Sequence, residues 1–287
     1  MFKESILNEI HREMDYISSD KFLKFCKDNS GNFTYLKTDN LFKSCTWRNQ
    51  NLKAAWREYL TKPITTNVIL GHSDIDVTQE KILMLRALGV RKVLTSNLRS
   101  VSKICDYIPL GLTNYSKEST DHIIMGNTAI LREAYLNLQK PNFQNLIFYR
   151  NYSTKNNWKI RSKLDAVLKN KVLRNKVVFR DTKISIEGRK NYLSEVREYG
   201  LVLCPKGNGY DSHRIWETLY LGGIPIVKIG ELPIKFPSSD QIPILKIKDW
   251  NQILDLAYIK EEVAKILSTP HDSRYLSCKY QLNNLKY

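Results

Sequence analysis

One stretch of the sequence, Leu201–Val227, limits the possible folds more than any other, and it reads LVLCPKGNGYDSHRIWETLYLGGIPIV. Its first four residues are apolar and predict a short buried strand, which a proline ends. A glycine turn and a predicted helix follow, the helix starting at Asp211 or Ser212 and running to about Leu221. After two more glycines, residues 224–227 predict a second buried strand. The order strand, glycine turn, helix, strand forms half of a doubly wound nucleotide-binding domain, which is an α/β fold.

The glycine turn in this stretch is a candidate phosphate-binding site. In doubly wound sheets the ligand lies beyond the carboxyl ends of the strands, where the free N–H groups of a helix N-terminus bind phosphate. Arg214 falls in the first turn of the predicted helix and can reach a diphosphate, while Glu217 lies one turn further and can accept hydrogen bonds from a ribose. The candidate binding residues here are Pro205, Lys206, Gly207, Asn208, Gly209, Asp211, Ser212, His213, Arg214 and Glu217.

Two less specific interpretations of this stretch stay open. Glycine turns before helices are common, and glycine motifs have a high false-positive rate. Arg214 and Glu217 are also spaced as an ordinary surface ion pair. Against the second interpretation, Ile215 and Leu219 predict the buried face of the helix, so the charged residues gather on the side nearest the turn.

The string CPKGNGYDSHRIWETLYLGGIPIV resembles the donor-site motif of exostosin-like glycosyltransferases. The resemblance covers residues 146–250 well and residues 64–111 faintly. It implies a GT-B fold, in which two Rossmann-like doubly wound domains face a cleft, and transfer of a sugar from a nucleoside diphosphate with inversion at the anomeric carbon. The family includes compact, anchor-free members from large DNA viruses, one of which transfers xylose to fucose. The resemblance therefore implies UDP-xylose as donor, with UDP favoured over GDP, and an oligosaccharide or glycoprotein as acceptor.

The expected architecture has three parts. Residues 1–140 form an acceptor-side domain, residues 141–270 a nucleotide-sugar domain, and residues 271–287 a C-terminal helix that crosses back onto the first domain, as the resemblance implies. The boundary falls at a polar break, and 287 residues are enough for two domains of ordinary size. The aromatic residues Trp47, Trp56 and Tyr59 have helix-compatible spacing and are expected to pack in a core.

A second loop is expected to meet the same ligand from the other side. Residues 146–150 predict a strand, and residues 156–168 predict the helix that follows it. The candidate donor-binding residues near this helix N-terminus are Arg150, Ser153, Thr154 and Arg161. In the resembling family this loop lines the donor pocket, although helix capping explains the two hydroxyl residues equally well.

The catalytic base is expected from the first half of the chain. Residues 64–70 predict a buried strand that ends in Gly-His-Ser-Asp-Ile-Asp, so three polar side chains would face the cleft. Because an acceptor hydroxyl must lose a proton, Asp74 is the first candidate base, with Asp76 and His72 as alternatives. A strand-end aspartate is also a common helix cap. The candidate acceptor-binding residues are Ser96 and Asn97, at the end of the next predicted strand.

Metal dependence separates this prediction from a first rival. Arginine side chains and helix N–H groups can stabilise a departing diphosphate, so we expect no metal and no cofactor. However, Asp74-Ile75-Asp76 is a D-x-D string, and the other large glycosyltransferase fold, GT-A, uses such a string to hold a divalent cation against the donor diphosphate. In that case the donor would lie in the first half.

The charge of the chain suggests a second rival. The 45 Lys and Arg against 29 Asp and Glu give a net charge of +16, which favours a polyanion, an acidic membrane or a phosphate-bearing substrate. With sixteen tyrosines, the chain could be a non-catalytic polyanion- or nucleic-acid-binding protein. We expect no nucleic-acid partner, because the lysines are dispersed and no known nucleic-acid motif is present.

The expected compartment is the cytoplasm, or the host cytoplasm for a viral protein. Five dispersed cysteines without a C-x-x-C pair argue for reduced thiols and against structural zinc. The charged N-terminal twenty residues lack the apolar run of a signal peptide. No segment approaches the roughly 20 apolar residues that span a bilayer. In this the chain departs from the best-known exostosins, which are anchored in the Golgi.

Overall fold

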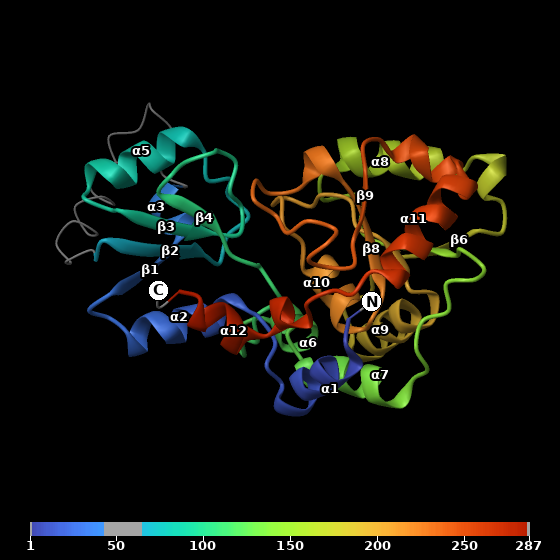
Figure 1. Ribbon diagram of the computed structural model, residues 1–287, viewed down its shortest axis with the longest axis horizontal. Coiled ribbons are helices and arrows are strands. Elements are labelled where there is room, and N and C mark those ends of the chain that lie inside the picture. The colour runs from blue at the N-terminus through green and yellow to red at the C-terminus, as the bar shows by residue number, and fades with distance from the viewer. Residues whose placement is uncertain (1, 43–64, 286–287) are drawn as a thin grey trace.

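The computed structural model describes residues 2–42 and 65–285, which form two α/β halves side by side (Figure 1). Each half contains one parallel sheet with helices on both faces. Trp47, Trp56 and Tyr59, and Ile64 of the strand predicted at 64–70, lie outside the described residues.

The first half contains a four-stranded parallel sheet in the order β1-β2-β3-β4. Its strands are β1 (Phe33–Lys37), β2 (Asn67–Gly71), β3 (Lys92–Thr95) and β4 (Cys105–Tyr107). Its helices are α2 (Ser19–Asp28), α3 (Thr38–Phe42) and α5 (Gln79–Ala87). Because all four strands run the same way, their carboxyl ends share the edge of the sheet that faces the second half (Figure 1).

The second half contains a five-stranded parallel sheet in the order β6-β5-β7-β8-β9. Its strands are β5 (Phe148–Asn151), β6 (Val177–Arg180), β7 (Leu201–Leu203), β8 (Ile224–Lys228) and β9 (Leu245–Ile247). Its helices are α8 (Trp158–Leu168), α9 (Ile186–Tyr199), α10 (His213–Tyr220) and α11 (Leu256–Ser268), with short 3-10 turns η1 (Lys171–Leu173), η2 (Ile229–Glu231) and η3 (Trp250–Leu254). The chain moves outward from β5 to β6 and then returns to the other side of β5 as β7. Such a reversal of strand order is the place where doubly wound sheets bind ligands.

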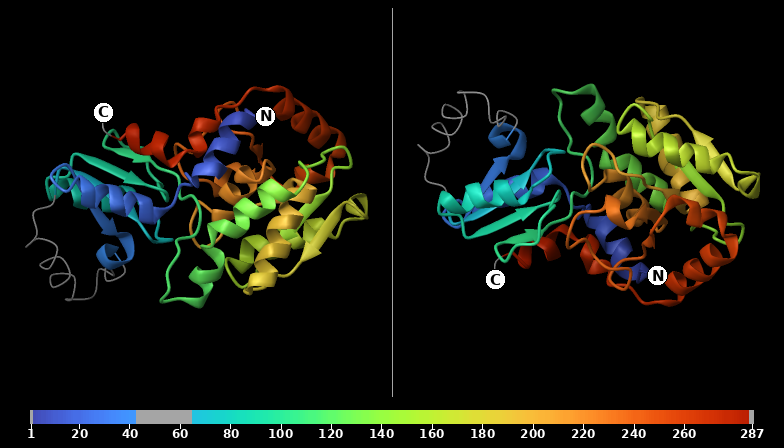
Figure 2. Two further views of the ribbon diagram at one scale, coloured as in Figure 1. Left: turned by 90° about the horizontal axis from the view of Figure 1, so that it is seen from below. Right: turned by 90° about the horizontal axis from the view of Figure 1, so that it is seen from above.

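The two chain ends each cross to the other half. Helix α1 (Glu4–Glu13) packs on η4 (Ser273–Leu276), while α6 (Thr120–Met125) and α7 (Thr128–Asn137) pack on α9. The last helix, α12 (Cys278–Asn283), instead lies beside α2 of the first half (Figure 2). There Asp15 accepts hydrogen bonds from the Ser277 hydroxyl and the Lys279 N–H, which attach the C-terminal segment.

Side chains that alternate along the strands build the cores. In β5, Phe148 faces a core with α8 and α11, whereas Tyr149 faces one that includes α9 and α10. In β2, Val68 faces α5, whereas Ile69 points to the opposite face. The core behind Tyr149 and Ile69 is continuous through both halves, and it includes the fully buried Trp216 of α10. This shared core holds the two carboxyl edges opposite each other.

Local backbone geometry and capping set the ends of two helices. Helix α1 ends at Glu13, because Met14 is left-handed with a φ of 51°, and Ser19 starts a new helix. Helix α9 begins at Ile186, because the Ser185 side chain caps it by accepting from Gly188 N–H. Within residues 2–42 and 65–285, no helix combines the length and the apolar character that crossing a bilayer requires.

Candidate functional site

A cavity of about 280 Å³ lies between the two carboxyl edges, at the strand reversal between β5 and β7. The predicted site residues that line it are Asp74, Ser153, Arg161, Gly207, Asn208, Gly209, Asp211, Ser212, His213, Arg214 and Glu217. Those that lie outside its walls are His72, Asp76, Ser96, Asn97, Arg150, Thr154, Pro205 and Lys206. Most of the glycine-turn stretch therefore lines one cavity, whereas Asp74 is the one predicted residue of the first half that does so; Leu110, Thr113 and Met125 also line it.

Two arginines form a cationic wall of this cavity. Arg161, on α8, is buried and donates to the main-chain carbonyls of Ser153 at 2.6 Å and Lys206 at 3.2 Å. Arg214, in the first turn of α10, has a buried Nε with no hydrogen-bond partner among the described residues. Burial, reinforced by the neighbouring Arg214 charge, lowers the pKa of Arg161 to about 10. Two like charges held together without a carboxylate are unfavourable unless an anion joins them.

The N-terminus of α10 adds backbone N–H donors to this wall. Ser212 precedes the helix, and its side chain makes no capping hydrogen bond. The first-turn N–H groups are therefore not satisfied by a side-chain cap, and the helix dipole adds partial positive charge there. Together with Arg161 and Arg214, this end of α10 has the chemistry that binds phosphate groups.

The glycines of the turn allow close packing around the cavity. A Cβ on Gly207 would come within 3.2 Å of Arg161 Nη2, and a Cβ on Gly209 would come within 2.8 Å of Asn97 Oδ1. The second contact is closer than real Cβ atoms tolerate, so a side chain at 209 would have to displace the Asn97 side chain, which hydrogen-bonds the turn. The turn thus needs glycine at 209 because Asn97 packs against its main chain.

Glu217 is held by two residues that the sequence reasoning missed. Arg189 donates to Glu217 Oε1 at 2.6 Å, and the Tyr192 hydroxyl donates to Oε2 at 2.8 Å. All three side chains are buried and line the cavity. Burial raises the pKa of Glu217, but Arg189 and Tyr192 outweigh it, so the pKa lies below its usual value. The carboxylate is therefore ionised and oriented, with further lone pairs to accept hydrogen bonds from a ligand.

Asp211 and Asn97 act as joints between the halves. Asp211 is buried and accepts from the Tyr107 hydroxyl, Leu110 N–H, Ser212 N–H and Trp216 Nε1. Burial raises its pKa, which these four donors oppose. Asn97 Oδ1 accepts from the N–H groups of Tyr210 and Asp211, and its Nδ2 donates to Ser73 O. These contacts use both polar atoms of the Asn97 side chain within the protein, and the neighbouring Ser96 is buried, so neither predicted acceptor-binding residue lines the cavity.

The three candidate bases have different surroundings. Asp74 is exposed and lines the cavity opposite Gly209. His72 lies away from the cavity, and its two ring nitrogens hydrogen-bond Tyr35 and Asp20. Asp76 is half-buried outside the cavity, and burial raises its pKa against the pull of nearby cations, Lys206 first. Of the three, Asp74 alone lies where a substrate in this cavity would meet it.

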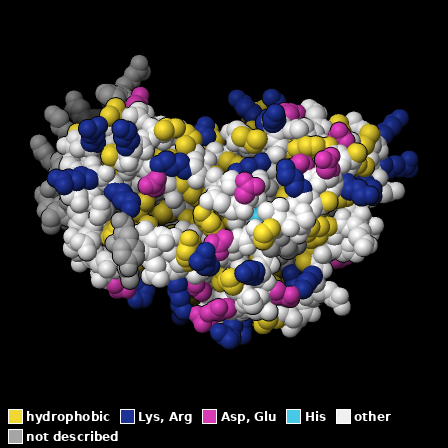
Figure 3. Space-filling view, viewed as in Figure 1, with side chains coloured by type: hydrophobic (Ala, Val, Ile, Leu, Met, Phe, Trp, Pro, Cys, Tyr) yellow, Lys and Arg dark blue, Asp and Glu magenta, His cyan; other side chains and the backbone are white. Residues whose placement is uncertain are grey.

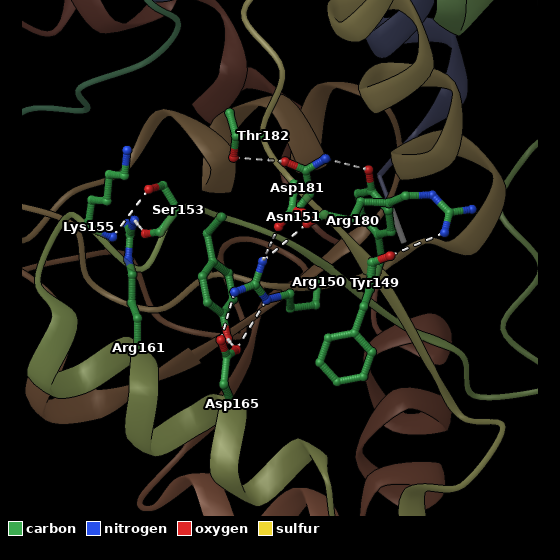
Figure 4. Close-up of polar contacts among 12 residues, drawn as sticks. Tyr149, Arg150, Asn151, Ser153, Lys155, Arg161, Asp165, Arg180, Asp181 and Thr182 are labelled. Carbon is green, nitrogen blue, oxygen red and sulfur yellow. Dashed lines mark hydrogen bonds and ion pairs between the residues drawn. The ribbon is translucent and has the colours of Figure 1, made fainter.

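The other predicted donor residues also have partners elsewhere. Arg150 forms a bidentate pair with Asp165, with Nε to Oδ1 at 3.1 Å and Nη2 to Oδ2 at 2.7 Å (Figure 4). This pair neutralises Arg150 within the β5-α8 unit, which explains why it does not reach the cavity. The Lys206 ammonium lies 3.2 Å from the centre of the Tyr210 ring, and its charge lowers the pKa of Asp76 against the effect of burial. Pro205 and Thr154 flank the cavity walls without lining them.

The end of β5 and the segment after β6 also contribute lining residues. Asn151 Oδ1 accepts from the Thr182 hydroxyl at 3.2 Å, and its Nδ2 donates to the Tyr149 hydroxyl (Figure 4). Asn151, Thr182 and Lys183 line the cavity. The predicted strand end at Arg150 was a usable signal for Asn151. Thr182 and Lys183 follow an edge strand and had no motif to identify them.

On the face shown in Figure 3, Lys and Arg side chains are scattered over both halves, with Asp and Glu among them. Within the described ranges, no group of three or more His, Cys, Asp or Glu side chains is placed to hold a metal ion.

Comparison with known proteins adds no relative. No protein-family model matches the chain, and no curated protein sequence matches it. The functional interpretation therefore depends on the residues of the cavity and on the motif at 201–227.

Proposed function

We propose that the chain is an exostosin-like glycosyltransferase with a GT-B fold, which transfers a sugar from a nucleoside diphosphate to a glycan hydroxyl. The proposed reaction inverts the anomeric carbon and needs no metal, and the proposed donor is UDP-xylose. Two parallel α/β sheets whose carboxyl edges face each other support this proposal, as does the motif resemblance at 201–227.

The observation that carries the proposal is the unpaired positive charge of the cavity. Arg161 and Arg214 border it without an acidic partner among the described residues, beside the uncapped N-terminus of α10. Three cationic or dipolar groups converge at a strand reversal, where a diphosphate would complete their hydrogen bonds. The ionised Glu217 lies one helical turn from Arg214 and lines the same cavity, where it can accept hydrogen bonds from a ribose attached to that diphosphate.

The proposed mechanism is a direct displacement. The acceptor oxygen attacks the anomeric carbon while the bond from this carbon to the diphosphate oxygen breaks. Asp74 takes the proton of the acceptor hydroxyl, because it is the exposed carboxylate of the first half that lines the cavity. Arg161, Arg214 and the first-turn N–H groups of α10 stabilise the negative charge of the departing diphosphate.

The proposed site of action is the cytoplasm. Cys26, Cys105, Cys204 and Cys278 are free and buried, and burial raises the pKa of the Cys204 thiol to about 12. Unpaired thiols of this kind are usual in a reducing compartment.

Incubation with a panel of nucleotide sugars in excess chelator tests the proposal. We expect release of UDP from UDP-xylose, and transfer when a fucose-containing acceptor is present. Asp74→Asn should abolish transfer but keep UDP binding. Activity that chelator removes and manganese restores would support the D-x-D alternative, and salt-sensitive nucleic-acid binding without any affinity for UDP or GDP would support the polyanion-binding alternative.

A further inference from the structure

A second cavity lies at the opposite edge of the five-stranded sheet, near the start of β8. It has a volume of about 250 Å³, and Leu7, Phe143 and Leu267 supply much of its apolar wall. Its walls come from helices α1, α9 and α11 and from the segment that follows α7. It shares no lining residue with the cavity between the halves. The two cavities lie at opposite ends of α10, because Gly222, just beyond the α10 C-terminus, lines the second one.

One cationic side chain in this apolar wall forms no ion pair with the described residues, although the charge of Glu4 acts on it from the rim. Arg197 is 5% exposed and donates from Nη1 to the Leu221 carbonyl at 2.6 Å, while its buried Nε has no partner among the described residues. The guanidinium packs over the Tyr135 ring at 4.7 Å from its centre. Glu4, at the rim, is instead bonded to Lys140 at 2.6 Å. Burial lowers the pKa of Arg197, which shows that its charge is poorly solvated.

The surroundings of Arg197 define the kind of ligand that fits. A carboxylate matches the fork of a guanidinium and would supply the missing negative charge. The apolar walls favour a ligand whose remaining atoms are hydrocarbon. The cavity volume equals about eight water molecules at roughly 30 Å³ each, which limits the ligand to a short-chain or single-ring acid.

We propose that this cavity binds a small apolar carboxylic acid, with its carboxylate on Arg197 and its hydrocarbon part against Leu7, Phe143 and Leu267. At the rim Lys140 is paired with Glu4, so Arg197 supplies the positive charge that an anion meets inside the cavity. The inference is independent of the proposed function, because neither Arg161 nor Arg214 takes part in it.

The test uses the full chain with hexanoate and phenylacetate as probes and their amides, hexanamide and phenylacetamide, as neutral controls. Titration calorimetry should show that at least one acid binds, and that its amide binds at least about tenfold more weakly because the charge-assisted hydrogen bonds are lost. Saturating UDP should not displace the acid, which separates this cavity from the one between the halves. Failure of both acids to bind, or equal binding of acid and amide, would overturn the proposal.

Two variants place the binding in this cavity. Leu267→Trp fills the space without touching Arg197 and should remove acid binding while the melting temperature stays near that of the wild type. Arg197→Lys should weaken acid binding by about tenfold, because lysine lacks the fork geometry. Arg174→Lys, at an exposed arginine, is the matched control and should bind like the wild type. Acid binding that survives Leu267→Trp would contradict the assignment even if Arg197→Lys fails to fold.

Discussion

Arg150 and Arg161 come from the same strand-loop-helix unit, but the structure places them in opposite environments. Arg150 forms a bidentate ion pair with Asp165. Arg161 instead hydrogen-bonds main-chain carbonyls and lies near a second cation, Arg214. Both are buried to a similar degree. Burial of an arginine therefore does not by itself distinguish a structural role from a binding role. A buried arginine that lines a cavity without an acidic partner among the described residues is the better binding candidate.

The largest expected effect is the loss of stability when the Arg150–Asp165 ion pair is broken. Arg150→Met leaves Asp165 without its partner, and removing one member of a buried pair costs about 3 to 5 kcal/mol of unfolding free energy. Denaturant unfolding measures this loss. The double variant Arg150→Met with Asp165→Leu should recover most of it. An unchanged unfolding free energy in the single variant would mean that the pair is not a structural element.

Removing one of the two neighbouring cations, Arg161 and Arg214, should affect ligand binding and not stability. Arg214→Met removes a charge that repels Arg161, so we expect no loss of stability, but UDP should bind about 10- to 100-fold more weakly because hydrogen bonds to charged groups contribute about 1.5 to 3 kcal/mol. Calorimetric titration with UDP checks this. Arg174→Met is the control for loss of an exposed arginine. If Arg214→Met were as destabilising as Arg150→Met, the contrast between the ion-paired Arg150 and the cavity arginines without an acidic partner would be wrong.

The glycine turn lines the same cavity as Arg161 and Arg214, so a change in its shape should also affect ligand binding. Gly209→Ala places a Cβ 2.8 Å from Asn97 Oδ1 and 3.1 Å from Asp74 Oδ1. We expect overpacking to cost about 1 to 3 kcal/mol and to weaken UDP binding as well. Gly230→Ala, where nothing lies within 4 Å, should leave thermal stability and UDP affinity near wild type. Equal behaviour of the two variants would show that the two halves do not press on the turn.

The smallest expected effect is on the pH dependence of stability, through Glu217. The ion pair with Arg189 keeps this carboxylate ionised. Its pKa in the folded state lies below the ordinary 4.5, so its contribution to stability is complete above that pH and is lost as the pH falls through the folded-state pKa. Tyr192→Phe removes one hydrogen bond and should lower the unfolding free energy by about 0.5 to 1.5 kcal/mol at neutral pH.

The difference between Tyr192→Phe and the wild type should shrink as the pH falls below 4.5. Urea unfolding at a series of pH values measures it, with the exposed Tyr115→Phe as control. A difference that stays constant down to the most acidic pH would show that the hydroxyl does not act through the charge of Glu217.

The sequence predicted the local structure around the cavity well. The expected strand, helix and strand at 201–227 are confirmed as β7, α10 and β8 with end shifts of a few residues. Apolar runs, a glycine turn and a cap residue are local signals, and each depends on neighbours in the chain. No such signal marks Met14, whose left-handed conformation ends α1 at Glu13.

The sequence could not predict which polar residues have partners. Arg150 pairs with Asp165 one helix away, and Asn97 contacts Tyr210 across more than a hundred residues. Arg189 and Tyr192 had the spacing of an ordinary helix surface, and their contact with Glu217 exists only because α9 packs beside α10. Such partners depend on tertiary packing, which local patterns do not encode.

A crystal structure with UDP tests the central claim most directly, because it locates the anion. We predict that the diphosphate lies between Arg161 and Arg214, with its oxygen atoms within hydrogen-bonding distance of both guanidinium groups and of the first N–H groups of α10. A nucleotide bound elsewhere, or a cavity that stays empty at a UDP concentration that saturates the protein in solution, would contradict the account.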